Sequence, residues 1–192
     1  LMEQNVELSR KLEELTAAEA LLSRQLKEAR SLLEDLEENL ERAQLRADSG
    51  QSSAAVGQML LRMRRDLPDM AALSGAGDQR QVDIAEAEME HWELTRRHHE
   101  LLREETSAQQ ALATMDEGAT RERGLDIVRQ HRQLVEDLRS AYSRRSATLA
   151  ELNETADQLS LKVDQFRRFI DQHLVSIRSA APLGPSLVGD VG

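Results

Sequence analysis

The amino-acid sequence predicts an all-α fold: an elongated antiparallel helical bundle or coiled coil with three long helices, one short helix and no β-sheet. Three observations carry this prediction. Of the 192 residues, 31% are charged and 40% hydrophobic, but only 2% are aromatic, which is too few for an ordinary mixed core. Apolar residues recur at alternating steps of three and four in three long segments, which is the spacing of one helix face. The chain has only three prolines, so little interrupts long helices.

Residues 1–48 carry the clearest of these apolar seams. A repeat held over five heptads predicts a coiled-coil helix about 60 Å long between its first and last seam positions. The register continues back to Leu1 without a capping residue, so we expect the chain to be cut from a longer helix in a larger protein. The seam consists of Leu8, Leu12, Leu15, Glu19, Leu22, Leu26, Ala29, Leu33, Leu36, Leu40, Ala43 and Ala47.

Two shorter elements follow in the prediction. A helix over 53–67 ends at Pro68, because the residue before a proline avoids the helical conformation. Gly75 and Gly77 predict a loop over 69–78. A third helix is expected over 79–115, with the polar residues His91, His98 and Glu105 interrupting its seam.

The fourth predicted helix, over 120–178, is the longest, at about 80 Å. A tight reversal at 116–119 makes it antiparallel to the third helix. Its seam runs through Val128, His131, Val135, Leu138, Tyr142, Arg145, Leu149, Leu152, Ala156, Leu159, Val163, Phe166, Ile170, His173 and Ile177. We expect a non-helical, extended tail over 179–192. The whole chain is predicted to form one elongated helical domain.

The bulkiest apolar cluster lies in the second half of this last helix, beyond the reach of the third helix. It needs another partner, which is either the first or second helix of the chain, a neighbouring subunit or a missing domain. The cluster is therefore predicted to form the main packing contact. It consists of Phe166, Phe169, Ile170, Leu174 and Ile177.

Charge and composition exclude several function classes. The 35 acidic and 25 basic residues give a net charge of -10, so binding to nucleic-acid phosphates is not expected. The absence of cysteine excludes disulfides, thiol nucleophiles and Cys-ligated metal sites. The spacing Glu88-x-x-His91 suits a metal-binding bundle, but a di-metal site needs a second such pair, and the chain has none. We expect no cofactor, no metal and no catalytic residues.

A basic run at the end of the short helix allows two interpretations. Arg62, Arg64 and Arg65 stand just before Leu67 and Pro68. Cations are favoured at a helix C-terminus, which is the structural interpretation. The functional interpretation is an anchoring patch for an anionic surface or for a partner's acidic helix. The only tryptophan, Trp92, is a further candidate for packing or interaction.

Three stretches resemble the N-terminal periplasmic helical domain of the large MscS-type mechanosensitive channels of Gram-negative bacteria, the potassium-dependent channel and its relatives. Residues 53–68 are similar to that family's short helix, which ends in a basic cluster and Leu-Pro. Residues 84–97 resemble a helix start of the form I-x-E-A followed by E-L. Residues 169–183 resemble the end of the family's rod, although Val175-Ser176 replaces the usual Leu-Trp.

The resemblance implies a periplasmic domain of an inner-membrane protein, placed before the pore-forming core of a heptameric channel of the osmotic stress response. Its partners would be the rest of the channel chain, neighbouring subunits and the envelope or membrane surface. It would not conduct ions itself, because the sequence has no apolar span or strand pattern that could line a membrane pore. Two alternatives stay open: a coiled-coil segment of a cytoplasmic protein, such as an arm of a chromosome-maintenance ATPase, and a metal or cofactor enzyme built on a bundle.

Overall fold

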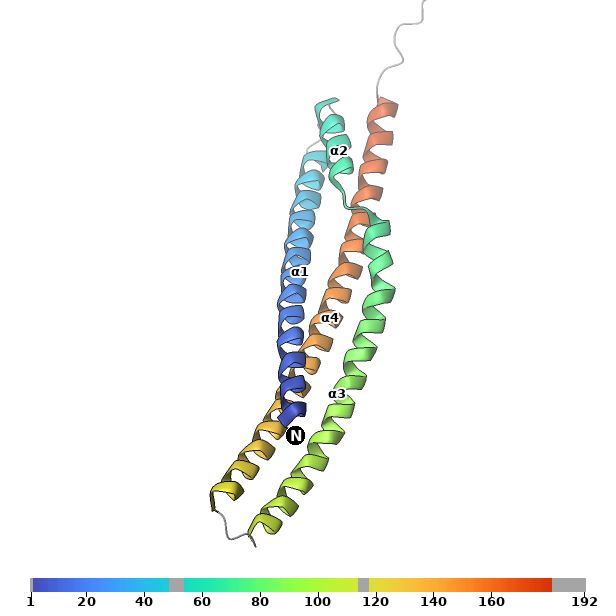
Figure 1. The fold of residues 1–192 in the computed structure, drawn as a ribbon. Helices are drawn as coiled ribbons and strands as arrows, with labels where there is room; N and C mark the ends of the chain where they lie inside the picture. The colour runs from blue at the N-terminus through green and yellow to red at the C-terminus, as the bar shows by residue number, and fades with distance from the viewer. Residues whose placement is uncertain (1, 49–53, 114–117, 181–192) are drawn as a thin grey trace, which may run out of the picture. The chain divides into compact units, whose positions relative to one another are not determined.

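A computed structural model describes residues 2–48, 54–113 and 118–180, which form four helices (Figure 1). Within these ranges no residue lies in a β-strand, and the predicted all-α bundle is confirmed. The helices are α1 (Met2–Asp48), α2 (Ala54–Asp66), α3 (Met70–Ala113) and α4 (Gly118–Ala180).

The helices contribute to two compact units. Unit 1 comprises Leu1–Ala29 and Gly75–Thr155, and unit 2 comprises Arg30–Ser74 and Ala156–Gly192. Unit 1 therefore contains the first part of α1, most of α3 and the first part of α4. Unit 2 contains the rest of these three helices together with α2. The single-domain organisation expected from the sequence stays a prediction.

Side-chain contacts fix the helix directions in unit 1. Arg80 bonds Asn153 and Arg132 bonds Glu105, so α3 and α4 run in opposite directions, as the short connection predicts. Asn5 contacts His131, and the side chain of Glu19 contacts Arg144, so α1 and α4 run in the same direction. The sequence left this parallel pairing open, because the connection between these helices is long.

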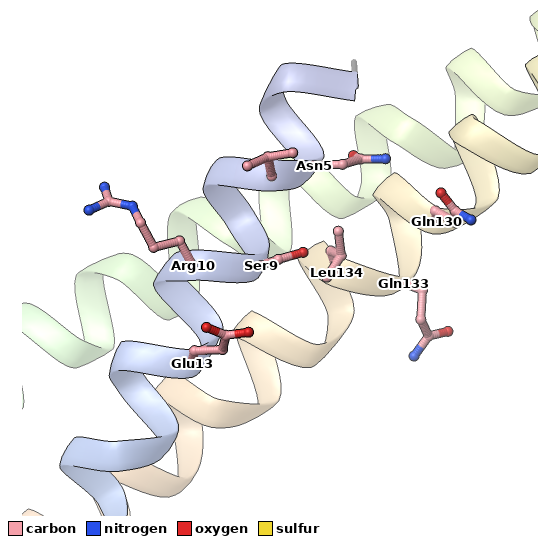
Figure 2. A pocket seen from close by; sticks show the side chains of 8 residues that line it. Asn5, Ser9, Arg10, Glu13, Gln130, Gln133 and Leu134 are labelled. Carbon is pink, nitrogen blue, oxygen red and sulfur yellow. The ribbon is translucent and has the colours of Figure 1, made fainter.

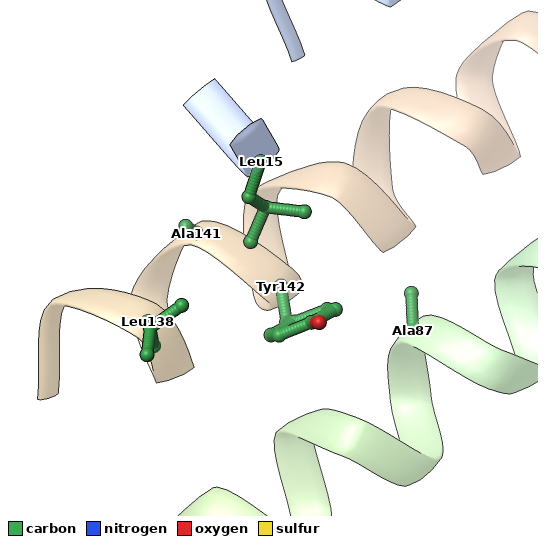
Figure 3. Close-up of a cluster of buried hydrophobic side chains, with 5 residues drawn as sticks. All are labelled: Leu15, Ala87, Leu138, Ala141 and Tyr142. Carbon is green, nitrogen blue, oxygen red and sulfur yellow. The ribbon is translucent and has the colours of Figure 1, made fainter. Parts of the chain in front are cut away.

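The core of unit 1 takes apolar side chains from three helices in one layer (Figure 3). Leu15 comes from α1, Ala87 from α3, and Leu138, Ala141 and Tyr142 come from α4. The small side chain of Ala87 leaves room for the Tyr142 ring, which points from α4 toward α3. Leu15, Leu138 and Tyr142 are predicted seam positions, so the 3-4 repeat identified the faces of α1 and α4 that pack here.

Unit 2 buries its apolar side chains from α1, α2 and α4. The described buried set contains Leu36, Leu40, Ala43, Leu60, Ala156, Leu159, Val163, Phe166 and Ile170. At ~25 cal/mol per Å² of apolar surface removed from water, the fully buried Phe166 and Ile170 each contribute about 2 to 3 kcal/mol. As far as Ile170, the second half of α4 is thus covered by the chain's own helices.

The prediction of a loop over 69–78 is wrong, because α3 begins at Met70. Asp69 stands at the N-cap position directly before it, where an aspartate is strongly preferred. Glycine inside a helix costs only about 1 kcal/mol relative to alanine. Three residues after Gly77, Arg80 Nε donates a hydrogen bond to Asn153 Oδ1 across 3.2 Å, which joins this part of α3 to α4.

The other helix ends differ from the prediction by a few residues. The fourth helix starts at Gly118, two residues early, and includes Ser179 and Ala180, which were assigned to the tail. Pro182 restricts only the residue directly before it, so helical structure can continue to Ala180. The rest of the predicted tail, 181–192, lies outside the described residues, as do the last two residues of the predicted third helix and the first two of the reversal, 114–117.

Candidate functional site

The predicted bulky cluster divides into a buried and a half-buried part within unit 2. Phe166 and Ile170 are 1% and 0% exposed, whereas Phe169 and Leu174 are half-buried. The Phe169 ring lies 4.1 Å from the His173 ring, centroid to centroid, and His173 Nδ1 donates to the Phe169 carbonyl across 2.9 Å. The side chain of Ile177 lies outside the described set. Phe166 and Ile170 therefore belong to the core of unit 2, whereas Phe169 and Leu174 keep part of their surface accessible.

The three arginines of the basic run lie in different environments. Arg64 Nη1 forms an ion pair with Asp171 Oδ1 across 3.0 Å, which links α2 to α4 within unit 2. Arg62 and Arg65 are exposed and form no ion pair with any described residue. Leu67 and Pro68, at the end of the run, are half-buried. Two of the three guanidinium groups are therefore available to a partner.

Trp92 lies on the surface of α3, with 62% of its area exposed. The guanidinium carbon of Arg96 is 5.5 Å from the ring centroid, a cation–π distance. Trp92 is predicted here as a packing or interaction residue, and it contributes to no core within the described chain. Unlike Phe166, which is buried in the core of unit 2, Trp92 therefore does not serve to pack the described chain.

A polar layer crosses unit 1 at the buried side chain of His131. His131 is 4% exposed, and its Nδ1 donates to Asn5 Oδ1 across 2.6 Å. The amide nitrogen of Asn5 in turn donates to the carbonyl of Ile127. Burial, together with the positive charge of Arg97, lowers the pKa of His131 below its ordinary value of 6.5. The layer therefore holds a neutral imidazole that fixes the register of α1 on α4.

Further polar contacts join α3 to α4 in the same unit. Arg132 bonds the buried carboxylate of Glu105. The side chain of His98 lies 3.6 Å from Glu136, and His91 Nδ1 donates to the carbonyl of Arg139 across 3.0 Å. The polar residues that interrupt the predicted seam of the third helix thus contact α4, as polar seam residues that fix register should.

A lysine bridges all three helices of unit 1. Lys11 Nζ donates to Glu90 Oε2 across 3.1 Å and lies 5.6 Å from the centroid of the Tyr142 ring. Burial disfavours its charge most strongly, but the bond to Glu90 and the interaction with Tyr142 together raise the pKa of Lys11 above 10.5. No 3-4 pattern could predict this contact, because Lys11 and Glu90 stand beside the seams.

An open groove runs between α1 and α4 in unit 1 (Figure 2). Ser9 and Leu134 face each other across it, whereas the side chain of Arg10 points away. The other lining residues are Asn5, Val6, Glu13, Gln130 and Gln133. Besides Arg10 and Glu13, the lining consists of three amides, one hydroxyl and two apolar side chains. Among the described residues, no hydrogen bond joins the Ser9 hydroxyl to a base, so the groove shows no activated nucleophile.

The spacing Glu88-x-x-His91 forms no metal site with other described residues. Glu88 is exposed, and His91 bonds a carbonyl of α4. Among residues 2–48, 54–113 and 118–180, no group of three or more His, Cys, Asp or Glu side chains could hold a metal ion.

Sequence reasoning missed the pairs Asn5–His131 and Glu105–Arg132 as contacts. The 3-4 repeat predicted that His131 and Glu105 stand at seam positions. It could not predict that Asn5 and Arg132 are their partners, because that depends on how the helices are placed along one another. A signal was present, because a polar residue at a buried seam position requires a polar partner on the facing helix.

Two findings bear on the class of protein. In the described parts of the chain, none of the helices contains a stretch that is long and apolar enough to cross a membrane. When the chain is compared with protein-family models, curated proteins and solved structures, none of them matches it.

Proposed function

We propose that this chain is a periplasmic helical scaffold and sensor domain of a large MscS-type mechanosensitive channel that acts in the osmotic stress response. It contacts the rest of the channel chain, neighbouring subunits and the envelope or membrane surface. It has no catalytic activity, binds no cofactor or nucleic acid, and does not conduct ions itself. The resemblance of residues 53–68, 84–97 and 169–183 to that domain motivates the proposal.

One observation supports a scaffold most directly: the seam of α4 is buried against the chain's own helices. From His131 to Ile170, every seam position except Arg145 is buried. A helix whose whole packing face is used in this way serves as a structural support. What it offers to partners is its outer surface.

The three-helix core of unit 1 counts against the arm of a chromosome-maintenance ATPase. In a two-stranded coiled coil each seam meets one partner helix. In unit 1, Tyr142 of α4 instead shares one core layer with Leu15 of α1 and Ala87 of α3. Three-helix packing of this kind suits a compact domain that carries lateral contacts.

The proposal is tested in the source organism with an antibody against this chain. We expect the protein in the inner-membrane fraction, with its epitopes cleaved by added protease once the outer membrane is permeabilised. The parent reading frame should contain a signal peptide upstream and several apolar spans downstream. A cytoplasmic protein, or a reading frame with a nucleotide-binding head, would refute the proposal.

A further inference from the structure

The outer face of α3 carries an exposed apolar stripe. Val82, Ala85, Met89 and Trp92 follow one another at steps of three, four and three, so they share one helix face. All four are exposed, and the three large ones are 59%, 62% and 62% exposed. The buried Ala87 and Leu101 lie on the opposite face of the same helix.

Glutamates border this stripe on both sides. At 100° per residue, Glu88 lies along one edge and Glu86 and Glu93 along the other, and all three are exposed. Arg96 closes one end, where it contacts the Trp92 ring. A complementary partner therefore presents apolar side chains flanked by cations.

Unit 2 presents such a surface on α2. A groove of 360 Å³ is lined by Ala55, Gln58, Met59, Arg62, Met63 and Asp66. Methionine adapts its shape and makes favourable sulfur–aromatic contacts, so Met59 and Met63 can accept an indole ring. Arg62, which lines the groove, and Arg65, which stands beside it, are exposed, and Arg46 contacts Met59 Sδ across 2.9 Å. Among the described residues named here, the three arginines outnumber one acidic residue, Asp66, so this surface carries a net positive charge.

We propose that the α3 stripe of one copy of this chain docks on the α2 groove of a second copy. Trp92 enters between Met59 and Met63, and Glu88 and Glu93 meet Arg62 and Arg65. The two surfaces differ, so each copy can use both at once, which builds a ring or an open chain. The inference rests on the proposed function, because it names the surfaces through which neighbouring channel subunits meet.

The size of the stripe sets the strength of this contact. Eleven residues of helix span about 16 Å, so the buried area falls below the roughly 1,200 to 2,000 Å² of a standard stable interface. The isolated chain should therefore be a monomer at micromolar concentration and associate as it approaches millimolar. In an assembly that holds the copies together, the effective concentration reaches the millimolar range.

The fluorescence of Trp92 tests the proposal on the full chain, because no other tryptophan is present. From micromolar to millimolar concentration we expect a blue shift of the emission and a parallel rise in mass by light scattering. The variants R62E/R65E and E88R/E93R should each lose both changes. An equimolar mixture of the two variants should regain them, since each then offers the other a complementary surface.

The controls separate this contact from other causes. R24E/R123E changes two exposed arginines on α1 and α4, outside both the stripe and the groove, and should associate like the parent chain. Circular dichroism checks that every variant keeps its helices. A constant emission, a shift that persists in R62E/R65E, or a mixture that stays monomeric would overturn the proposal. So would a shift caused by phosphatidylglycerol vesicles without any gain in mass from self-association. None of these results bears on the cellular location, which tests the proposed function separately.

Discussion

The two units share α1, α3 and α4 but use different kinds of contact. All three buried polar side chains among the described residues, namely Glu105, His131 and Thr155, lie in unit 1. Unit 2 instead buries a phenylalanine and an isoleucine, and its ion pairs Arg64–Asp171 and Glu37–Lys162 lie at partly exposed positions. Unit 1 thus adds buried polar contacts to its apolar core, whereas the buried side chains described in unit 2 are apolar.

This difference has a physical reason. A leucine seam tolerates sliding by a heptad, because every step presents the same apolar surface. Asn5–His131 and Glu105–Arg132 remove that freedom in unit 1, since a shifted register would leave His131 or Glu105 buried without a partner. In unit 2 the large ring of Phe166 gives the same specificity through shape.

The largest effect is expected from Phe166→Ala in unit 2. Removing a fully buried ring leaves a cavity, so the free energy of unfolding should fall by about 3 to 5 kcal/mol. Chemical denaturation measures the loss. Hydrogen exchange should show faster exchange at Leu159 and Val163 of unit 2 than at Leu138 of unit 1.

Leu161→Ala is the matched control for that variant. Leu161 stands on the same helix but is 64% exposed, so its removal should change stability by less than about 0.5 kcal/mol. Equal losses in the two variants would mean that the far end of α4 is not packed as described.

The next effect is expected from Arg132→Ala in unit 1. The substitution leaves the buried Glu105 carboxylate without its ion-pair partner, which should cost about 2 kcal/mol. Arg129→Ala removes the exposed pair with Asp126 on the same helix and should cost about 0.5 kcal/mol or less. Thermal unfolding of the two variants compares the values. Equal values would contradict the role given to buried polar contacts in unit 1.

How far the sequence predicts this structure depends on the kind of interaction. The seams of α1 and α4 follow from periodicity alone, because burial of one helix face repeats every three or four residues. The position of α1 relative to α4 does not, because it depends on single pairs such as Asn5 and His131. No local signal encodes which two helices bring such residues together.

The site residues show the same limit. Phe166 and Ile170 were predicted as packing residues, and they are buried. Trp92 and the arginines of α2 were identified by residue type, but only the structure separates the paired Arg64 from the exposed Arg62 and Arg65. The loop over 69–78 was mispredicted because two glycines were given more weight than the Asp69 cap.

That misprediction leads to a stabilising variant, Gly77→Ala. An added Cβ would lie 3.9 Å from Arg80 Nη2 and from Asn153 Oδ1, an ordinary contact distance. Alanine is favoured over glycine inside a helix, so stability should rise by about 0.5 to 1 kcal/mol. Thermal unfolding measures the gain. A loss of stability would mean that this stretch of α3 is not a regular helix.

The smallest effect is expected from the pH dependence of unit 1. Because the pKa of His131 is lowered in the folded chain, the unfolded chain binds a proton more readily below pH 6.5. The contribution of His131 to stability is therefore complete above that pH and is lost as the pH falls toward the folded-state pKa. Unfolding temperatures measured from pH 7.5 down to 5.5 should decrease. His131→Gln should reduce this slope, because glutamine does not titrate. A slope unchanged by His131→Gln would show that the Asn5–His131 layer is not where the folded chain resists protonation.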